Sequence, residues 1–185
     1  MLRLYRFLLM LSIGVVVCSC QSTASDAPLR MEDQFSAVVV EAERIVVGQT
    51  VYVPVYSHVY QRNVNNPVMQ LSATLSIRNT DLTNSLILTA VRYYNSNGEL
   101  VRNILTTPIE IPALASADYL VESEDTSGGI GANFIVEWVA ETTVTEPVIE
   151  TLMIATTGNQ GISFTSPGRV IQQQGIQVAE PPASP

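Results

Sequence analysis

Hydrophobic and polar residues alternate through the middle of the chain, and this period most restricts the folds that the chain can adopt. In residues 71–80 the odd positions from Leu71 to Ile77 are apolar, and the positions between them are serine or threonine. A period of two puts the apolar side chains on one face of a strand, whereas a helical face repeats every 3.6 residues. The turn-forming sequence Asn79-Thr80-Asp81 follows. The pattern therefore predicts a half-buried β-strand that ends at this turn.

Comparable segments recur along the chain at fairly regular spacing. They are rich in aliphatic, β-branched or aromatic residues and are joined by turns that contain Gly, Pro or Asn. Asn97-Gly98 lies between two of them and is typical of a tight hairpin. No segment shows strong helical periodicity with caps. The expected strands are residues 37–47, 51–60, 71–80, 85–95, 100–105, 117–123, 133–140, 148–156 and 162–165.

This organisation predicts an all-β fold, a single antiparallel β-sandwich that is immunoglobulin-like in general architecture and has no major helix. In residues 133–140 the even positions carry Phe134, Val136 and Trp138, which we expect to form the central core stack. Arg78 and Arg92 lie in expected strands. Either is expected to pair with an acid across the sheet, in a structural role.

The start of the chain resembles the signal of a bacterial lipoprotein. Two arginines precede a largely apolar segment, residues 7–17, which has about half of the ~20 residues that a membrane-spanning helix requires. The segment ends in Val17-Cys18-Ser19-Cys20, which resembles a lipobox. The resemblance implies cleavage before Cys20 and lipidation of Cys20, because the small Ser19 suits the position before the cut. An ordinary signal peptide with a chance cysteine is the alternative.

The chain is expected to divide into four parts. Residues 1–19 are the signal peptide, and residues 20–33 are small and polar, which predicts a flexible tether. Residues 34–171 are the β-sandwich domain. Residues 172–185 begin with three glutamines and contain three prolines, a composition typical of a disordered tail.

The composition argues against several classes of partner and cofactor. The formal net charge is −8, and nucleic-acid binding requires basic clusters, so no nucleic acid is expected. The only two cysteines are Cys18 and Cys20. The folded domain would therefore have no thiol for catalysis, a disulfide, an iron–sulfur cluster or a thiolate zinc site, and we expect no cofactor.

Catalytic motifs are sparse. His58 is the only histidine, so a Ser–His–Asp triad would depend on it, and no Gly-x-Ser-x-Gly sequence is present. Ser127-Gly-Gly-Ile-Gly-Ala132 resembles a phosphate-binding loop. A phosphate loop needs a helix directly behind it, whereas a strand is expected here. The favoured interpretation is a flexible loop whose glycines supply positive φ.

Residues 51–60 combine valines on one face with aromatic residues on the other. Pro54 cannot donate a backbone hydrogen bond, which places the expected strand at a sheet edge. One hypothesis is that Tyr56, His58 and Tyr60 form a partner-binding surface, because exposed aromatic side chains are enriched at interfaces. The alternative is that another segment covers them and that Pro54 only prevents edge-to-edge pairing.

An acidic run precedes the glycine-rich loop. Asp118, Glu122, Glu124 and Asp125 are weak candidates for a calcium site, because calcium binds carboxylate and carbonyl oxygens. The spacing lacks the alternating acids of an EF-hand loop. The favoured interpretation is a solvated acidic edge that binds no metal.

Five sequence blocks spread over most of the chain together carry a resemblance to a known family. They are residues 51–58, 75–81, 91–94, 131–138 and 160–166. These blocks resemble an uncharacterised bacterial lipoprotein family, domain of unknown function three-one-two-four. The resemblance spans roughly residues 50–170 and implies no particular activity or site.

The sequence therefore favours a membrane-anchored, non-enzymatic binding or scaffolding module of the cell envelope. The expected partners are the membrane, through a lipid on Cys20, and an unknown envelope protein or ligand. Gln21 rather than Asp follows the cysteine, which by resemblance to sorted lipoproteins implies the outer membrane, facing the periplasm, in a Gram-negative cell. The alternative is a carboxylate-based envelope hydrolase, which requires two facing carboxylates about 5–10 Å apart.

Overall fold

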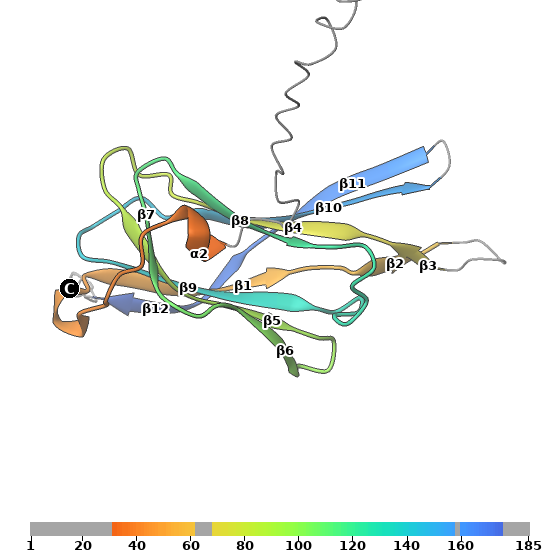
Figure 1. Ribbon diagram of the computed structural model, residues 1–185, viewed down its shortest axis with the longest axis horizontal. Helices are drawn as coiled ribbons and strands as arrows, with labels where there is room; N and C mark the ends of the chain where they lie inside the picture. The colour runs from red at the N-terminus through yellow and green to blue at the C-terminus, as the bar shows by residue number, and fades with distance from the viewer. Residues whose placement is uncertain (1–30, 62–67, 158–159, 176–185) are drawn as a thin grey trace, which may run out of the picture.

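Two antiparallel β-sheets pack face to face and enclose one hydrophobic core (Figure 1). The computed structural model describes residues 31–61, 68–157 and 160–175. The predicted signal peptide, Cys20 and residues 176–185 lie outside the described residues. The all-β sandwich predicted from the alternating sequence is confirmed. None of the helices in the described ranges has the length and apolar character of a membrane span.

The larger sheet has six strands, and β5 is the strand to which both β6 and β7 pair. Its main order is β12-β1-β9-β5-β6. The strands are β1 (Val47–Pro54), β5 (Leu86–Tyr94), β6 (Leu100–Leu105), β7 (Ile109–Ile111), β9 (Asn133–Ala140) and β12 (Arg169–Gly175).

The smaller sheet has four strands in the order β11-β10-β4-β8, and a separate hairpin pairs β2 with β3. The only helical segments in the described residues are short, the helical turn α2 (Met31–Gln34) and the 3-10 turn η1 (Ala42–Arg44). The remaining strands are β2 (His58–Tyr60), β3 (Val68–Gln70), β4 (Ser72–Arg78), β8 (Ser116–Val121), β10 (Val148–Thr157) and β11 (Gln160–Pro167).

The core consists of the inward faces of both sheets. On β4 the apolar positions predicted from the period of two are buried, and on β9 Phe134, Val136 and Trp138 are buried as predicted. The predicted cross-strand ion pairs are also present. Arg92 on β5 contacts Glu137 on β9, and Arg78 on β4 lies 4.0 Å from Glu150 on β10.

The turn after β4 is held by the side chain of Asn79, which is buried. Its Nδ2 donates to the carbonyl oxygens of Asn84 at 2.9 Å, Ile111 at 3.1 Å and Pro112 at 3.0 Å, and its Oδ1 accepts the N–H of Asp81 at 3.0 Å. One side chain therefore connects the turn between β4 and β5 to the end of β7.

Asp81 holds the same turn from the other side. Its Oδ2 accepts the N–H of Thr145 at 2.9 Å, and its Oδ1 accepts the N–H groups of Thr83 at 3.0 Å and Asn84 at 2.8 Å. These backbone hydrogen bonds, that of Thr145 first, hold the pKa of Asp81 well below its usual range. The carboxylate thus ties the loop after β9 to the turn after β4.

The prediction of a strand over residues 37–47 is wrong. Ala37 makes only an isolated bridge to Ile109, η1 occupies residues 42–44, and β1 begins at Val47. Glu41, Glu43 and Arg44 are all exposed, and as a strand they would place charges on both faces. The segment therefore follows the surface.

The prediction of one edge strand over residues 51–60 is also wrong. β1 ends at Pro54 and lies between β12 and β9, and β2 starts at His58. Pro54 is tolerated in this internal strand because β12 pairs with β1 only as far as Tyr52. The Pro54 carbonyl accepts a hydrogen bond from Thr151 Oγ1 at 2.6 Å.

The ordered elements extend beyond both predicted boundaries of the domain, residues 34 and 171. Met31–Gln34 forms α2, so the last residues of the predicted tether are helical. Gln172, Gln173 and Gln174 belong to β12 and pair with Thr50, Gln49 and Gly48. All residues of β12 are exposed, so backbone hydrogen bonds rather than burial hold this edge strand, and composition could not reveal it.

Candidate functional site

One end of the sandwich gathers three segments that are distant in sequence. They are the paired strands β2 and β3, the end of β10 with the start of β11, and the loop of residues 122–132 between β8 and β9 (Figure 1). The N–H of Ser57 donates to the Gly129 carbonyl at 3.2 Å, and the N–H of Leu71 donates to the Ser57 carbonyl at 2.9 Å. The loop therefore contacts the base of the β2–β3 hairpin. We call this region the hairpin end.

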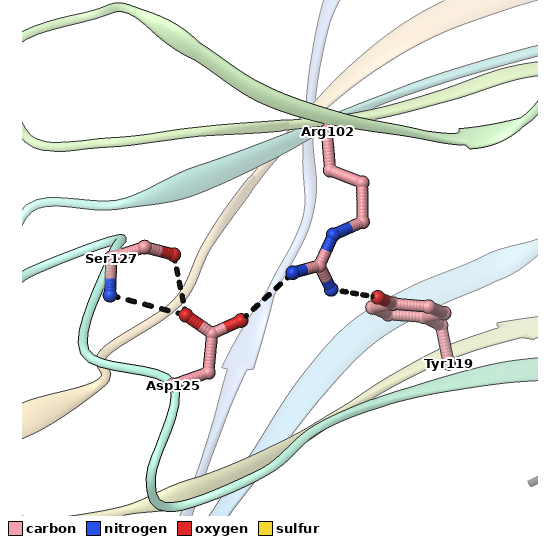
Figure 2. Close-up of polar contacts among 4 residues, drawn as sticks. All are labelled: Arg102, Tyr119, Asp125 and Ser127. Atoms are coloured by element: carbon pink, nitrogen blue, oxygen red, sulfur yellow. Dashed lines mark hydrogen bonds and ion pairs between the residues drawn. The ribbon is translucent and has the colours of Figure 1, made fainter.

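A polar cluster at this loop connects the two sheets. Figure 2 shows Arg102, from β6 of the larger sheet, between Tyr119 of β8 and Asp125 of the loop. Arg102 Nη1 donates to Tyr119 Oη at 2.5 Å, and Arg102 Nη2 lies 3.3 Å from Asp125 Oδ2. Asp125 Oδ1 accepts the N–H of Ser127 at 3.1 Å and also contacts its hydroxyl. Each of the four side chains thus contacts at least one of the others.

The charges in this cluster compensate each other. Partial burial alone would raise the pKa of Asp125, but hydrogen bonds from Ser127 and the charge of Arg102 outweigh it, so the pKa is lowered. Burial first, and then the charge of Asp125, raises the pKa of the Tyr93 phenol beneath the loop to about 12. The phenol is therefore neutral at physiological pH. A paired aspartate and a neutral phenol suit a structural connection better than acid–base chemistry.

The glycine-rich loop is packed against the sheet. A Cβ atom on Gly128 would lie 1.8 Å from Tyr93 Oη, and Gly129 has a φ of +81°. Ser96 Oγ donates to the Gly128 carbonyl at 3.0 Å and accepts the N–H of Gly131 at 2.9 Å. Strand β9 follows at Asn133. The strand expected directly behind the loop is therefore present, and of the loop glycines Gly129 supplies positive φ whereas Gly128 allows close packing on Tyr93.

The four acidic candidates for a metal site do not converge. Asp118 lies exposed on β8, Glu122 and Glu124 are exposed after it, and Asp125 is paired with Arg102. No group of three or more His, Cys, Asp or Glu side chains in the described residues is placed to hold a metal ion.

The three predicted partner-binding residues have different surroundings. Tyr56 is half-buried and packs edge-to-face on Phe164 of β11, with ring centroids 5.8 Å apart. His58 is half-buried, and its Nδ1 lies 3.1 Å from Ser57 Oγ. Tyr60 is 72% exposed, and its ring centroid is 5.9 Å from that of His58. The role of this surface stays a prediction, and Tyr60 is its exposed member.

An open groove of about 520 Å³ lies at the hairpin end. Its described walls come from β3, β10, the start of β4 and the segment after β8, so no local sequence pattern could have found it. We call it the hairpin groove. Its lining residues are Gln61, Val68, Met69, Gln70, Ser72, Ser123, Ile154, Ala155 and Thr156.

Comparisons with known proteins place the chain in a family. No curated protein matches the sequence. A solved structure named "Crystal Structure of Thermotoga maritima 1070" is 12% identical, with a TM-score of 0.37, and the match covers 65% of this chain and 92% of that chain. Residues 48–171 match the family described as "Protein of unknown function (DUF3124)", which confirms the resemblance drawn from the sequence blocks. The chain belongs to this family of proteins of unknown function, DUF3124.

Proposed function

We propose that the protein is a lipid-anchored, non-enzymatic binding or scaffolding module of the bacterial cell envelope. The anchor is a lipid on Cys20, supported by the lipobox-like sequence Val17-Cys18-Ser19-Cys20. Gln21 after the cysteine supports the outer membrane, facing the periplasm, as its location in a Gram-negative cell.

The observation that carries the binding role is the exposed ring of Tyr60 at the hairpin end. An aromatic side chain that is 72% exposed is costly to leave in water and favourable to bury against a partner. Tyr60 lies on β2 opposite Val68, and Val68 lines the hairpin groove. Ring and groove together offer one continuous surface for a partner.

No observation favours the alternative of a carboxylate-based envelope hydrolase. Such an enzyme needs one carboxylate with a raised pKa facing a second one. The pKa of Asp125 is lowered by its contacts with Ser127 and Arg102, and Glu137 is paired with Arg92. These acids support the fold, because Glu137 joins two strands and Asp125 joins a loop to a strand.

Two experiments test the proposal. Mass spectrometry of the mature protein should find an acylated Cys20 at the N-terminus, and Cys20→Ala should abolish acylation and membrane attachment. An unmodified peptide that spans residues 19–30 in the mature wild-type protein would refute the anchor.

The binding surface is tested by photo-crosslinking in intact cells. A photoreactive phenylalanine analogue at position 60 should give a discrete crosslinked product. Unlabelled wild-type protein should compete for the partner and reduce this product, whereas the Tyr60→Ala variant should not. The matched control is the same analogue at Val39, which is 87% exposed and lies beside the turn after β4. Equal products from both positions, or no product at position 60, would contradict the binding surface.

A further inference from the structure

The hairpin groove has a chemical character that narrows the class of ligand. We propose that it binds an uncharged oligosaccharide. This inference rests on the proposed binding function and specifies its ligand.

The groove exists because β10 continues beyond its neighbour in the smaller sheet. β10 pairs with β4 only as far as Ile154 opposite Ser72, whereas it pairs with β11 through Thr157. β3, which precedes β4 with only Leu71 between them, turns away to pair with β2. The two strands therefore diverge, and the groove lies between β3 and the projecting part of β10.

The lining combines neutral hydrogen-bonding groups with aliphatic surface. The described side chains that line the groove include no charged group. Amides and hydroxyls both donate and accept hydrogen bonds, as sugar hydroxyls do, and the aliphatic groups can cover the C–H faces of a sugar ring. The polar residues are Gln61, Gln70, Ser72, Ser123 and Thr156, and the apolar residues are Val68, Met69, Ile154 and Ala155.

Electrostatics argue against an anionic ligand. The chain has a formal net charge of −8, and the exposed Glu122 and Glu124 flank Ser123 of the groove, so an anion would be repelled. The same field attracts a cation, but no carboxylate is among the described lining residues to pair with a cation inside the groove. The neutral hydrogen-bonding groups of the lining therefore match a neutral ligand.

The shape also fits a segment of a chain of sugars. A volume of about 520 Å³ lies within the range of small-molecule sites, and the groove is open to solvent rather than enclosed. Tyr60, exposed on β2 opposite Val68, supplies an aromatic face at the margin of the groove on which a further sugar ring can stack.

The test is a titration of the mature, lipidated protein in a detergent without a sugar head group. The probes are two neutral trisaccharides, tri-N-acetylchitotriose and maltotriose, of which the first carries amides and the second only hydroxyls. The comparison ligands are trigalacturonate, which has the same number of rings but carries carboxylates, and a neutral Gly-Ser peptide of similar length. Binding is followed by the methyl NMR signals of Met69, Ile154 and Ala155.

The groove is blocked by Thr156→Trp, and the matched control is Thr165→Trp on the same hairpin. Both threonines are exposed, and Thr165 does not line the groove. At least one neutral trisaccharide should shift the three methyl signals, with an affinity about tenfold or more above that of trigalacturonate. Thr156→Trp should weaken that binding at least about tenfold, whereas Thr165→Trp should change it less than about twofold.

Several results would overturn the inference. The first is the absence of methyl shifts with both trisaccharides at about 20 mM, which would put any dissociation constant above the millimolar range. The second is that trigalacturonate or the peptide binds as tightly as the trisaccharides. The third is that the two tryptophan variants weaken binding equally. These outcomes are separate from the proposed function. Crosslinking at position 60 that persists without saccharide binding would leave a binding module whose ligand is of another class.

Discussion

Replacement of Asn79 by alanine is expected to lower the free energy of unfolding by about 3 kcal/mol. The side chain is 2% exposed, and three carbonyl oxygens surround its Nδ2. An amide group has only two hydrogens, so these three contacts amount to two full hydrogen bonds. The bond that Oδ1 accepts from the N–H of Asp81 is the third. Each contributes about 1 kcal/mol, which leads to the expected total.

The aspartate variant separates hydrogen bonding from shape. Asn79→Asp keeps nearly the same volume, but its carboxylate would face the carbonyl oxygens of Asn84, Ile111 and Pro112 with no hydrogen to donate. The negative charge would also lie in the same turn as the carboxylate of Asp81, two residues along the chain. A buried unpaired charge costs more than a lost neutral hydrogen bond, so the aspartate variant should be less stable than the alanine variant.

Urea unfolding followed by fluorescence measures both effects. The single tryptophan, Trp138, is buried and reports on the core. With a slope of about 2 kcal/mol per molar urea, the midpoint of Asn79→Ala should fall by about 1.5 M. Asn103→Ala, exposed on β6, is the matched control and should change stability by less than about 0.5 kcal/mol. A loss below about 1 kcal/mol for Asn79→Ala, or an aspartate variant that is as stable as the alanine variant, would refute the reasoning.

Three further predictions concern the fold. The folded-state pKa of Asp81 is lowered from its ordinary value of 3.8, so in acid the unfolded state binds more protons than the folded state, and the urea midpoint should fall as the pH drops below 3.8. Asp81→Asn should be less stable at neutral pH, and its stability should depend less on pH. A pH dependence equal to that of the wild-type protein would contradict this. In a urea titration Gly128→Ala should lower the free energy of unfolding by about 3 kcal/mol, because its Cβ would overlap Tyr93 Oη. The control Gly98→Ala should lower it by about 1 kcal/mol, because Gly98 has a φ of +79° but open space around it. Equal losses for the two variants would count against the clash. Trp138→Ala should lower the free energy of unfolding by about 4 kcal/mol, measured by urea unfolding followed by circular dichroism. A loss below about 2 kcal/mol would show that the surrounding core collapses into the cavity.

The strands with one buried face were predictable from the sequence. β4 and β9 were located to within a residue or two, because their core faces impose a period of two on neighbouring residues. The short strands β3 and β7 have three residues each, which is too few for a period of two to be recognised in the sequence. β12 is exposed throughout and is held by its backbone, so its glutamines indicated a tail instead.

The candidate site was only partly predictable. Tyr60 was singled out because aromatic residues alternate with valines, and its exposure fits that pattern. The partners of Arg102 were not predictable, because Tyr119 and Asp125 reach it from the opposite sheet and from a loop. The same holds for the hairpin groove, which depends on the divergence of β3 from β10.

The sequence by itself determined the class of the fold, the family, the positions of strands such as β4 and β9, and the core residues on those two strands. These properties are local, since burial of one face leaves its period in consecutive residues. Only the tertiary structure decided the strand order, the carbonyl groups that Asn79 binds, the pairing of Asp125 with Arg102 and the walls of the hairpin groove. Each of these joins groups far apart in the chain, and backbone hydrogen bonds between strands are chemically alike at every position. The choice among possible pairings is therefore made by the packing of the whole core.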